Sequence, residues 1–160
     1  MERWKPAKNP IRTAARAIII RDGYLLVTKN VDAVGEWYLL PGGGQQHGED
    51  LLSALRRECW EEIGCGVRVG RLRFVRDYIG KNHEFADEDG GEHQVELIFE
   101  CELEPGQEPG TAVEADSMQT GVVWLELAPL PAHRFYPRAL IPHLVRLNDA
   151  DRVVYLGDVN

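Results

Sequence analysis

The sequence predicts an α/β fold of the α+β type, a mixed α/β sandwich in which helices pack on the sheets. Three observations support this prediction: apolar segments that alternate as strands do, one amphipathic helix in the first half of the chain, and a helical segment near its end. The 160 residues fit one domain with a full core and show no repeat or linker. We therefore expect residues 1–160 to form a single domain.

The first expected elements form a hairpin. Residues 11–21 are apolar and β-branched toward their end, Asp22-Gly23 is a strong turn signal, and residues 24–28 return as a second strand. Arg16 lies within the first of these strands. A contact to phosphate and an ordinary surface position are both open readings for its side chain.

A third strand is expected over residues 37–40, and it ends at Pro41 because proline cannot donate to a sheet ladder. The three glycines at 42–44 then form a loop whose backbone can adopt positive φ and approach a ligand closely. A plain turn is the alternative reading of this loop.

The next element is a helix, expected over residues 49–63. Glu49 and Asp50 suit its start, where the helix dipole favours negative side chains, and Gly64 suits the left-handed position that ends it. Arg57 lies two turns after Glu49, so we also expect an ion pair between these two side chains.

Three carboxylates share one face of this helix. At about 100° per residue, Glu58, Glu61 and Glu62 fall together beside the apolar stripe that faces the core. Like charges at this spacing destabilise a helix by roughly 0.2–0.5 kcal/mol per pair. A divalent cation would offset the repulsion, and Mg²⁺ prefers such oxygen ligands. An ordinary solvated acidic face is the alternative.

The spacing of this segment resembles the Nudix box. The pattern is a glycine, five residues, a glutamate, seven residues and then Arg-Glu-x-x-Glu-Glu-x-Gly, and it is matched by Gly43, Glu49, Arg57, Glu58, Glu61, Glu62 and Gly64. Cys59 and Cys65 stand where the family usually has larger aliphatic residues, which affects packing more than chemistry. The chain is therefore similar to Nudix hydrolases over this segment.

The resemblance implies a Nudix-type α/β/α sandwich with a mixed central sheet, and hydrolysis of a nucleoside diphosphate linked to another moiety. It implies a metal cofactor, Mg²⁺ with Mn²⁺ as an alternative, bound by Glu58, Glu61, Glu62 and the carbonyl of Gly42. Glu58 and Glu61 are candidate catalytic residues as well. The residues implied to support the box structurally are Gly43, Glu49, Arg57 and Gly64.

Outside the box, the resemblance places a further carboxylate before the last main strand, and Glu114 or Asp116 is the candidate catalytic base there. A carboxylate that binds a cation is not free to take a proton from the attacking water, so a separate base is expected. Glu58 or Glu61, with one fewer metal ion bound, is the alternative. The acidic residues of 81–92 are less favoured, because we expect a mobile hairpin loop there.

The expected substrate is a small nucleotide, with an ADP-ribose-like nucleotide sugar as the first candidate. Nucleoside triphosphates and dinucleoside polyphosphates are alternatives, and so is a catalytically inactive domain that senses a nucleotide. The candidate substrate-binding residues are arginines for phosphate or base contacts and aromatic residues for stacking: Arg16, Arg76, Trp37 and Tyr38.

In the remaining chain, alternating patterns predict strands over residues 67–79, 93–103 and 120–127. A closing helix is expected over residues 137–147, with Pro137 tolerated in its first turn, followed by a short strand over residues 153–156. Trp60 falls opposite the acidic face of the box helix, so we expect it to pack under another element or at a homodimer contact.

Composition narrows the choice of partners. The formal net charge of −8 argues against nucleic acid as a partner, because nucleic-acid-binding proteins usually carry a basic patch. No apolar run reaches the roughly 18 residues of a membrane span, and the first residues lack a signal-peptide core, so we expect a cytoplasmic protein with no membrane partner. Three cysteines without a CxxC pair suggest neither a disulfide framework nor a zinc site.

Overall fold

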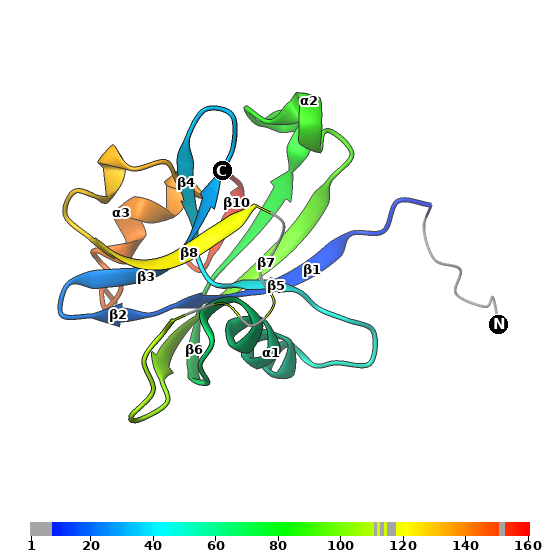
Figure 1. Cartoon of the computed structure of the whole chain (residues 1–160). Helices are drawn as coiled ribbons and strands as arrows, with labels where there is room; N and C mark the ends of the chain where they lie inside the picture. The colour runs from blue at the N-terminus through cyan, green and yellow to red at the C-terminus, as the bar shows by residue number, and fades with distance from the viewer. Residues whose placement is uncertain (1–7, 111, 113, 115–117, 151–152) are drawn as a thin grey trace.

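The computed structural model describes residues 8–110, 112, 114, 118–150 and 153–160. In this part of the chain, strands form two sheets with helices beside them (Figure 1). The strands are β1 (Arg12–Ile18), β2 (Ile20–Arg21), β3 (Tyr24–Val31), β4 (Glu36–Leu39), β5 (Gly42–Gly44), β6 (Val67–Ile79), β7 (His93–Leu103), β8 (Gln119–Glu126), β9 (Phe135–Tyr136) and β10 (Tyr155–Asp158). The helices are α1 (Leu51–Ile63), α2 (Ala86–Asp89) and α3 (Ile141–Leu144), with 3₁₀ turns at Gly80–Asn82, Leu130–Ala132 and Arg138–Leu140.

Both sheets are mixed. The first has the order β10-β6-β7-β1-β5, in which β1 runs parallel to β7 and β10 runs parallel to β6, while the other pairs are antiparallel. The second has the order β2-β3-β4-β9, and β8 also pairs with β3. The predicted combination of helices with mixed β-structure is confirmed, with two sheets where one central sheet was expected.

Two apolar clusters join these sheets to the helices, with α1 and α3 on different sides of the molecule (Figure 1). The cluster under α1 contains small residues of β1, which let the helix approach the sheet closely: Ala15 and Ala17 meet Leu55, Cys59 and Ile63. The other cluster packs α3 against both sheets through Ile18, Leu25, Phe74, Ile141 and Leu144. Each fully buried large side chain stabilises the fold by about 1.5–3 kcal/mol.

The predicted hairpin is present. Ile20 pairs with Leu25 and Arg21 with Tyr24, so the connection has two residues. Asp22 has φ 53° and Gly23 has φ 82°, which is the pair of positive angles that a type I′ turn requires.

Helix α1 starts two residues later than predicted, because Asp50 is its N-cap. The Asp50 carboxylate accepts a hydrogen bond of 2.7 Å from the Ser53 amide, which satisfies one of the orphan donors of the first turn. The helix ends as predicted at Gly64, whose φ of 70° is left-handed and whose N–H donates to the Trp60 carbonyl.

Later parts of the chain match the predictions in part. Strands β6 and β7 have the predicted bounds, and β8 and β10 are shifted by one and two residues respectively. The predicted closing helix over 137–147 is wrong: a 3₁₀ turn leads into the four-residue α3, because Pro142 lies inside the predicted span and cannot donate the hydrogen bond of a continuous helix. Residues 81–92, predicted as a loop, contain α2 and part of a 3₁₀ turn.

The cysteines are free and buried, as expected from their spacing. Trp60 is 52% exposed, so the expectation that another element of the chain covers it is wrong, and a homodimer contact stays a prediction. In the described ranges, no helix is long and apolar enough to cross a membrane.

Candidate active site

Residues 42–44 form strand β5, and not the expected loop, because they pair with β1 just before the chain enters α1. Arg16 pairs with Gly42 and Ala15 with Gly43 in an antiparallel register. Gly42 has φ 136°, and a β-carbon on it would overlap the Ala15 carbonyl oxygen. The chain can make this approach only because residue 42 is a glycine.

Two of the three predicted carboxylates reach this glycine strand from α1. The Glu62 side chain is nearly buried, and its Oε2 accepts a hydrogen bond of 2.9 Å from the Gly42 amide. The Glu58 carboxylate lies over Gly43, where a β-carbon would stand 2.5 Å from the Glu58 Cδ. Helix and strand are therefore held together by polar groups of the box itself.

Arg57 connects the acidic side chains of the helix. Its Nε donates to Glu49 at 2.8 Å, as the sequence predicted, and its Nη1 donates to Glu58 at 2.9 Å and to Glu61 at 3.2 Å. Its Nη2 also donates to the carbonyl of Gly44 at 3.0 Å. The hydrogen bond to Arg57, joined by one from the backbone, lowers the pKa of Glu49. One guanidinium thus orients two candidate metal ligands.

Three described residues before or at the start of β8 donate hydrogen bonds to the C-terminal end of α1. The Gly110 amide donates to the Ile63 carbonyl at 3.1 Å, and the Glu114 amide donates to the Glu61 carbonyl at 2.9 Å. The Gln119 side-chain amide donates to the Glu62 carbonyl at 2.8 Å. These bonds satisfy carbonyls that the helix itself leaves unpaired. They also place the backbone of Glu114 beside the acidic helix, while Asp116 lies outside the described residues.

The structure does not gather the four predicted substrate-binding residues into one place. Arg16 and Arg76 meet at a shared partner, Glu96. Tyr38 is buried in the cluster around α3 and packs edge-on against the His133 ring. Trp37 lies on the opposite face of β4, because neighbouring strand residues alternate, and its buried Nε1 has no hydrogen-bond partner in the described part of the chain. Their roles as substrate contacts therefore stay predictions.

The donor set fits a hard cation by its chemistry. Mg²⁺ and Mn²⁺ prefer carboxylate and carbonyl oxygens, which Glu58, Glu61, Glu62 and Gly42 provide around the start of β5 and the second half of α1. Among the residues that the structure describes, no three acidic, histidine or cysteine side chains form a preassembled metal cluster. Here Arg57 supplies the positive charge beside Glu58 and Glu61.

Sequence reasoning missed two residues that contact the site. The Glu96 side chain is 4% exposed and lies between two arginines. Gln119 donates its side-chain amide to the Glu62 carbonyl. No local pattern signals either role, because each contact joins strands or helices that are distant in sequence.

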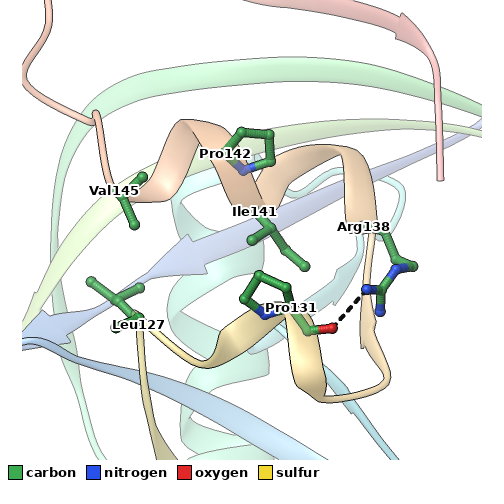
Figure 2. A pocket seen from close by; sticks show the side chains of 7 residues that line it. Leu127, Pro131, Arg138, Ile141, Pro142 and Val145 are labelled. Atoms are coloured by element: carbon green, nitrogen blue, oxygen red, sulfur yellow. Dashed lines mark hydrogen bonds between the residues drawn. The ribbon is translucent and has the colours of Figure 1, made fainter.

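An apolar pocket of about 440 Å³ lies elsewhere, between the end of β8 and α3. Figure 2 shows Arg138 at its edge, donating to the Pro131 carbonyl at 2.8 Å. Its lining contains none of the predicted site residues: it consists of Leu127, Ala128, Pro131, Arg138, Ile141, Pro142 and Val145.

Comparisons with known proteins agree on one family. A family model described as the NUDIX domain matches residues 10–144. The chain is similar to the nucleoside triphosphatase NudI of Salmonella agona (strain SL483), with 36% identity over 97 residues that cover 56% of this chain and 67% of that protein. Its structure is similar to that of a UDP-X diphosphatase, with 20% identity, a TM-score of 0.69 and coverage of 95% of this chain and 69% of that one. It is also similar to an ADP-ribose pyrophosphatase of Streptococcus suis 89-1591, with 19% identity, a TM-score of 0.62 and coverage of 92% and 98%. At such identities the structural likeness shows the fold.

Proposed function

Since the chain belongs to the Nudix hydrolase family, we propose that its active site is the surface where the α1 carboxylates meet β5. The enzyme is a Nudix pyrophosphohydrolase acting on nucleoside diphosphate-linked substrates. The observation that carries the assignment of the site is the contact of two box carboxylates with the glycine strand. The Glu62 carboxylate accepts a hydrogen bond from the Gly42 amide, and the Glu58 carboxylate lies against Gly43.

Nudix hydrolases generally use divalent metal ions, and we assign Mg²⁺, with Mn²⁺ as an alternative, to this site. The ligands would be the carboxylates of Glu58, Glu61 and Glu62 with the carbonyl of Gly42. The metal would neutralise the pyrophosphate charge and lower the pKa of a bound water. Arg57 donates hydrogen bonds to Glu58 and Glu61 and so orients both carboxylates.

The protein groups perform the remaining steps. A carboxylate outside the metal set, from Glu114 or Asp116, accepts the proton of the attacking water. Arg16, Arg76, Trp37 and Tyr38 stay predictions as substrate contacts. Arg16 is the best placed of the four, because its Nη1 lies 2.7 Å from the carbonyl of Gly42.

Two substrate classes are candidates. An ADP-ribose-like nucleotide sugar is the first, on the resemblance of the sequence. A nucleoside triphosphate is the second, because NudI, the 36% identical relative, is named a nucleoside triphosphatase. Both contain a nucleoside diphosphate linked to another group, so the same arrangement of ligands serves either.

The test is a substrate panel with Mg²⁺, in which released phosphate, pyrophosphate and nucleoside monophosphate are quantified. We expect turnover of at least one class and its loss on metal chelation. Glu58→Gln and Glu62→Gln should each lower kcat beyond the roughly 10–100-fold typical of an outer-shell change. Glu102→Gln, at an exposed Arg68 ion pair, is the matched control and should retain activity. Near wild-type rates in both site variants at saturating Mg²⁺ would remove the assignment.

A further inference from the structure

A buried carboxylate on β7 is shared by two arginines from the strands on either side. Glu96 Oε1 accepts from Arg16 Nε at 3.1 Å, and Glu96 Oε2 accepts from Arg76 Nε at 2.6 Å. Gln94 Nε2 donates to Glu96 Oε1 at 2.8 Å as well. The side chains of Glu96 and Arg76 are 4% and 6% exposed. The carboxylate is therefore fully engaged and held from several directions.

Arg16 links this carboxylate to the glycine strand. While its Nε faces Glu96, its Nη1 donates to the Gly42 carbonyl at 2.7 Å. The Gly42 amide in turn donates to Glu62 Oε2 at 2.9 Å. A continuous chain of hydrogen bonds thus runs from Glu96 through Arg16 and Gly42 to a carboxylate of the box.

The geometry of arginine makes this chain directional. The guanidinium group is planar, and its donors point along fixed directions. When Glu96 fixes the Nε edge of Arg16, it also fixes where Nη1 meets Gly42. Gly42 has no side chain and adopts φ 136°, so the position of its peptide group depends on the backbone and on such contacts.

The charges support the same coupling. Burial lowers the pKa of Arg16, but the carboxylates of Glu96, Glu62 and Glu58 together outweigh burial and raise it, with Glu96 contributing most among the three. Arg16 therefore interacts electrostatically both with its structural partner on β7 and with the acidic face of α1. Glu96 balances the charge of Arg76 too, whose Nη1 donates to the Val159 carbonyl at 2.5 Å.

We propose that Glu96 is a positioning residue of the active site. By holding Arg16, it sets the Gly42 carbonyl and the Glu62 carboxylate in the geometry that binds the divalent cation. The inference rests on the proposed function for the identity of the metal ligands. The rival explanation is that Glu96 only joins β1, β6 and β7.

The chain offers a matched control for that rival. Arg73 and Glu100 form another ion pair between β6 and β7, with Arg73 Nε 2.6 Å from Glu100 Oε2. The Arg73 side chain is 6% exposed and the Glu100 side chain is 38% exposed, so the Glu100 carboxylate is less buried than that of Glu96. Arg73 Nη1 also donates to the Leu147 carbonyl, and none of the hydrogen bonds described for this pair reaches β5. Glu100→Gln therefore weakens the same strand pair without touching the chain to Gly42.

The experiment is a titration of each purified variant with Mn²⁺ alone, with free Mn²⁺ measured by electron paramagnetic resonance and folding checked by circular dichroism. Glu96→Gln should weaken Mn²⁺ binding by about 10–100-fold, the loss that is typical when a residue that orients a metal ligand is replaced. Glu100→Gln should stay within about twofold of the wild type. Unchanged binding in folded Glu96→Gln, or equal weakening in both variants, would overturn the proposal.

Glu96→Gln leaves two buried arginines without their counter-charge and could prevent folding, so Arg16→Lys is the second variant. It keeps a positive charge beside Glu96, but a single ammonium cannot reproduce the two fixed donor directions. It should weaken Mn²⁺ binding by a similar factor while remaining folded. Wild-type Mn²⁺ affinity in Arg16→Lys would overturn the proposal even if Glu96→Gln cannot be purified.

This result is separable from the proposed function. If no nucleotide is hydrolysed but Mn²⁺ binding depends on Glu58 and Glu96, the positioning role stands and the reaction is wrong. If nucleotides are hydrolysed and Mn²⁺ binding depends on Glu58 but not on Glu96 or Arg16, the reaction stands and the positioning role is wrong.

Discussion

The Glu58 carboxylate lies directly over Gly43, and a β-carbon on Gly43 would stand 2.5–2.7 Å from the Glu58 Cδ and both carboxylate oxygens. A glycine is therefore needed at this place in the box because the Glu58 carboxylate leaves no room for a β-carbon. Its φ does not fall in the left-handed region, so a side chain at this position is excluded by the Glu58 carboxylate and not by the backbone.

Gly43→Ala should consequently lower activity more than stability. The clashing atoms are the end of a flexible side chain, so Glu58 can move aside at a cost of about 1 kcal/mol or less. A displacement of about 1 Å in a reacting group can lower turnover by about a hundredfold. The measurement is kcat at saturating metal together with the free energy of unfolding in urea.

Gly44→Ala is the control for this prediction. A β-carbon on Gly44 meets the guanidinium group of Arg12, an exposed side chain that can swing away. We expect activity and stability close to the wild type. Equal loss of activity in the two variants would show that the whole strand, and not the space over Gly43, matters.

Gly42→Ala should behave in the opposite way, because its neighbours are backbone atoms. A β-carbon there would overlap the Ala15 carbonyl oxygen and lie 2.8 Å from the Arg16 Cα, and φ is 136°. Neither obstacle can rotate away. Backbone strain alone costs about 1–3 kcal/mol, so we expect at least that loss in the free energy of unfolding. A variant as stable as the wild type would contradict the close approach of β5 to β1.

Local sequence patterns predicted the elements whose information lies within a few residues. The alternation in β6 and β7 was sufficient to give both bounds, and the Asp22-Gly23 turn was sufficient to give the hairpin. The box predicted the position of α1 and its ion pair between Glu49 and Arg57. Each of these follows from turn chemistry, strand period or helix geometry.

Long-range partners could not be predicted in this way. Glu96 meets Arg16 and Arg76 because β7 lies between β1 and β6, and the register of a parallel pair joined over 80 residues has no local signal. Gln119 reaches the Glu62 carbonyl for the same reason. The continuous closing helix is absent from the described residues for a local reason, because Pro142 has no N–H to donate inside a helix.

The buried cluster at Glu96 predicts a specific pH dependence of stability. Burial opposes the charge of Glu96, but Arg16, Arg76 and their hydrogen bonds outweigh burial and hold its pKa at about 2, below the ordinary 4.5. A carboxyl group with a lowered pKa in the folded state stabilises the fold above the unfolded pKa and loses that contribution as pH falls. Gln94, the other polar neighbour, also donates a hydrogen bond to the Glu96 carboxylate.

Glu96→Gln should therefore be less stable than the wild type by roughly 3–5 kcal/mol near neutral pH, as expected for a broken buried pair. The difference should shrink as pH falls from about 4.5 toward about 2, where the wild-type carboxyl becomes protonated. Urea unfolding of both proteins across this window measures it. A difference that stays constant through the window would show that Glu96 is not ionised in the folded protein.

We predict that the catalytic base comes from the segment before β8. A backbone contact of Glu114 supports this choice. Its amide donates to the Glu61 carbonyl at 2.9 Å, so its backbone is anchored to the acidic helix. The acidic residues of 84–89 lie around α2 instead, where Asp89 accepts from the Tyr78 hydroxyl at 2.8 Å. Proton transfer requires a base positioned within hydrogen-bond reach of the water, which favours the anchored segment.

The test compares pH–rate profiles of Glu114→Gln, Asp116→Asn and a variant with the acids of 84–89 neutralised. A base must be ionised to act, so the wild-type rate should fall as pH drops below its pKa. Glu114→Gln or Asp116→Asn should lower kcat by about 10²–10⁴-fold and abolish that acidic limb. The variant of residues 84–89 should keep the limb. If only that variant loses it, the segment before β8 is wrong; if all three keep it, Glu58 or Glu61 of the box is the base.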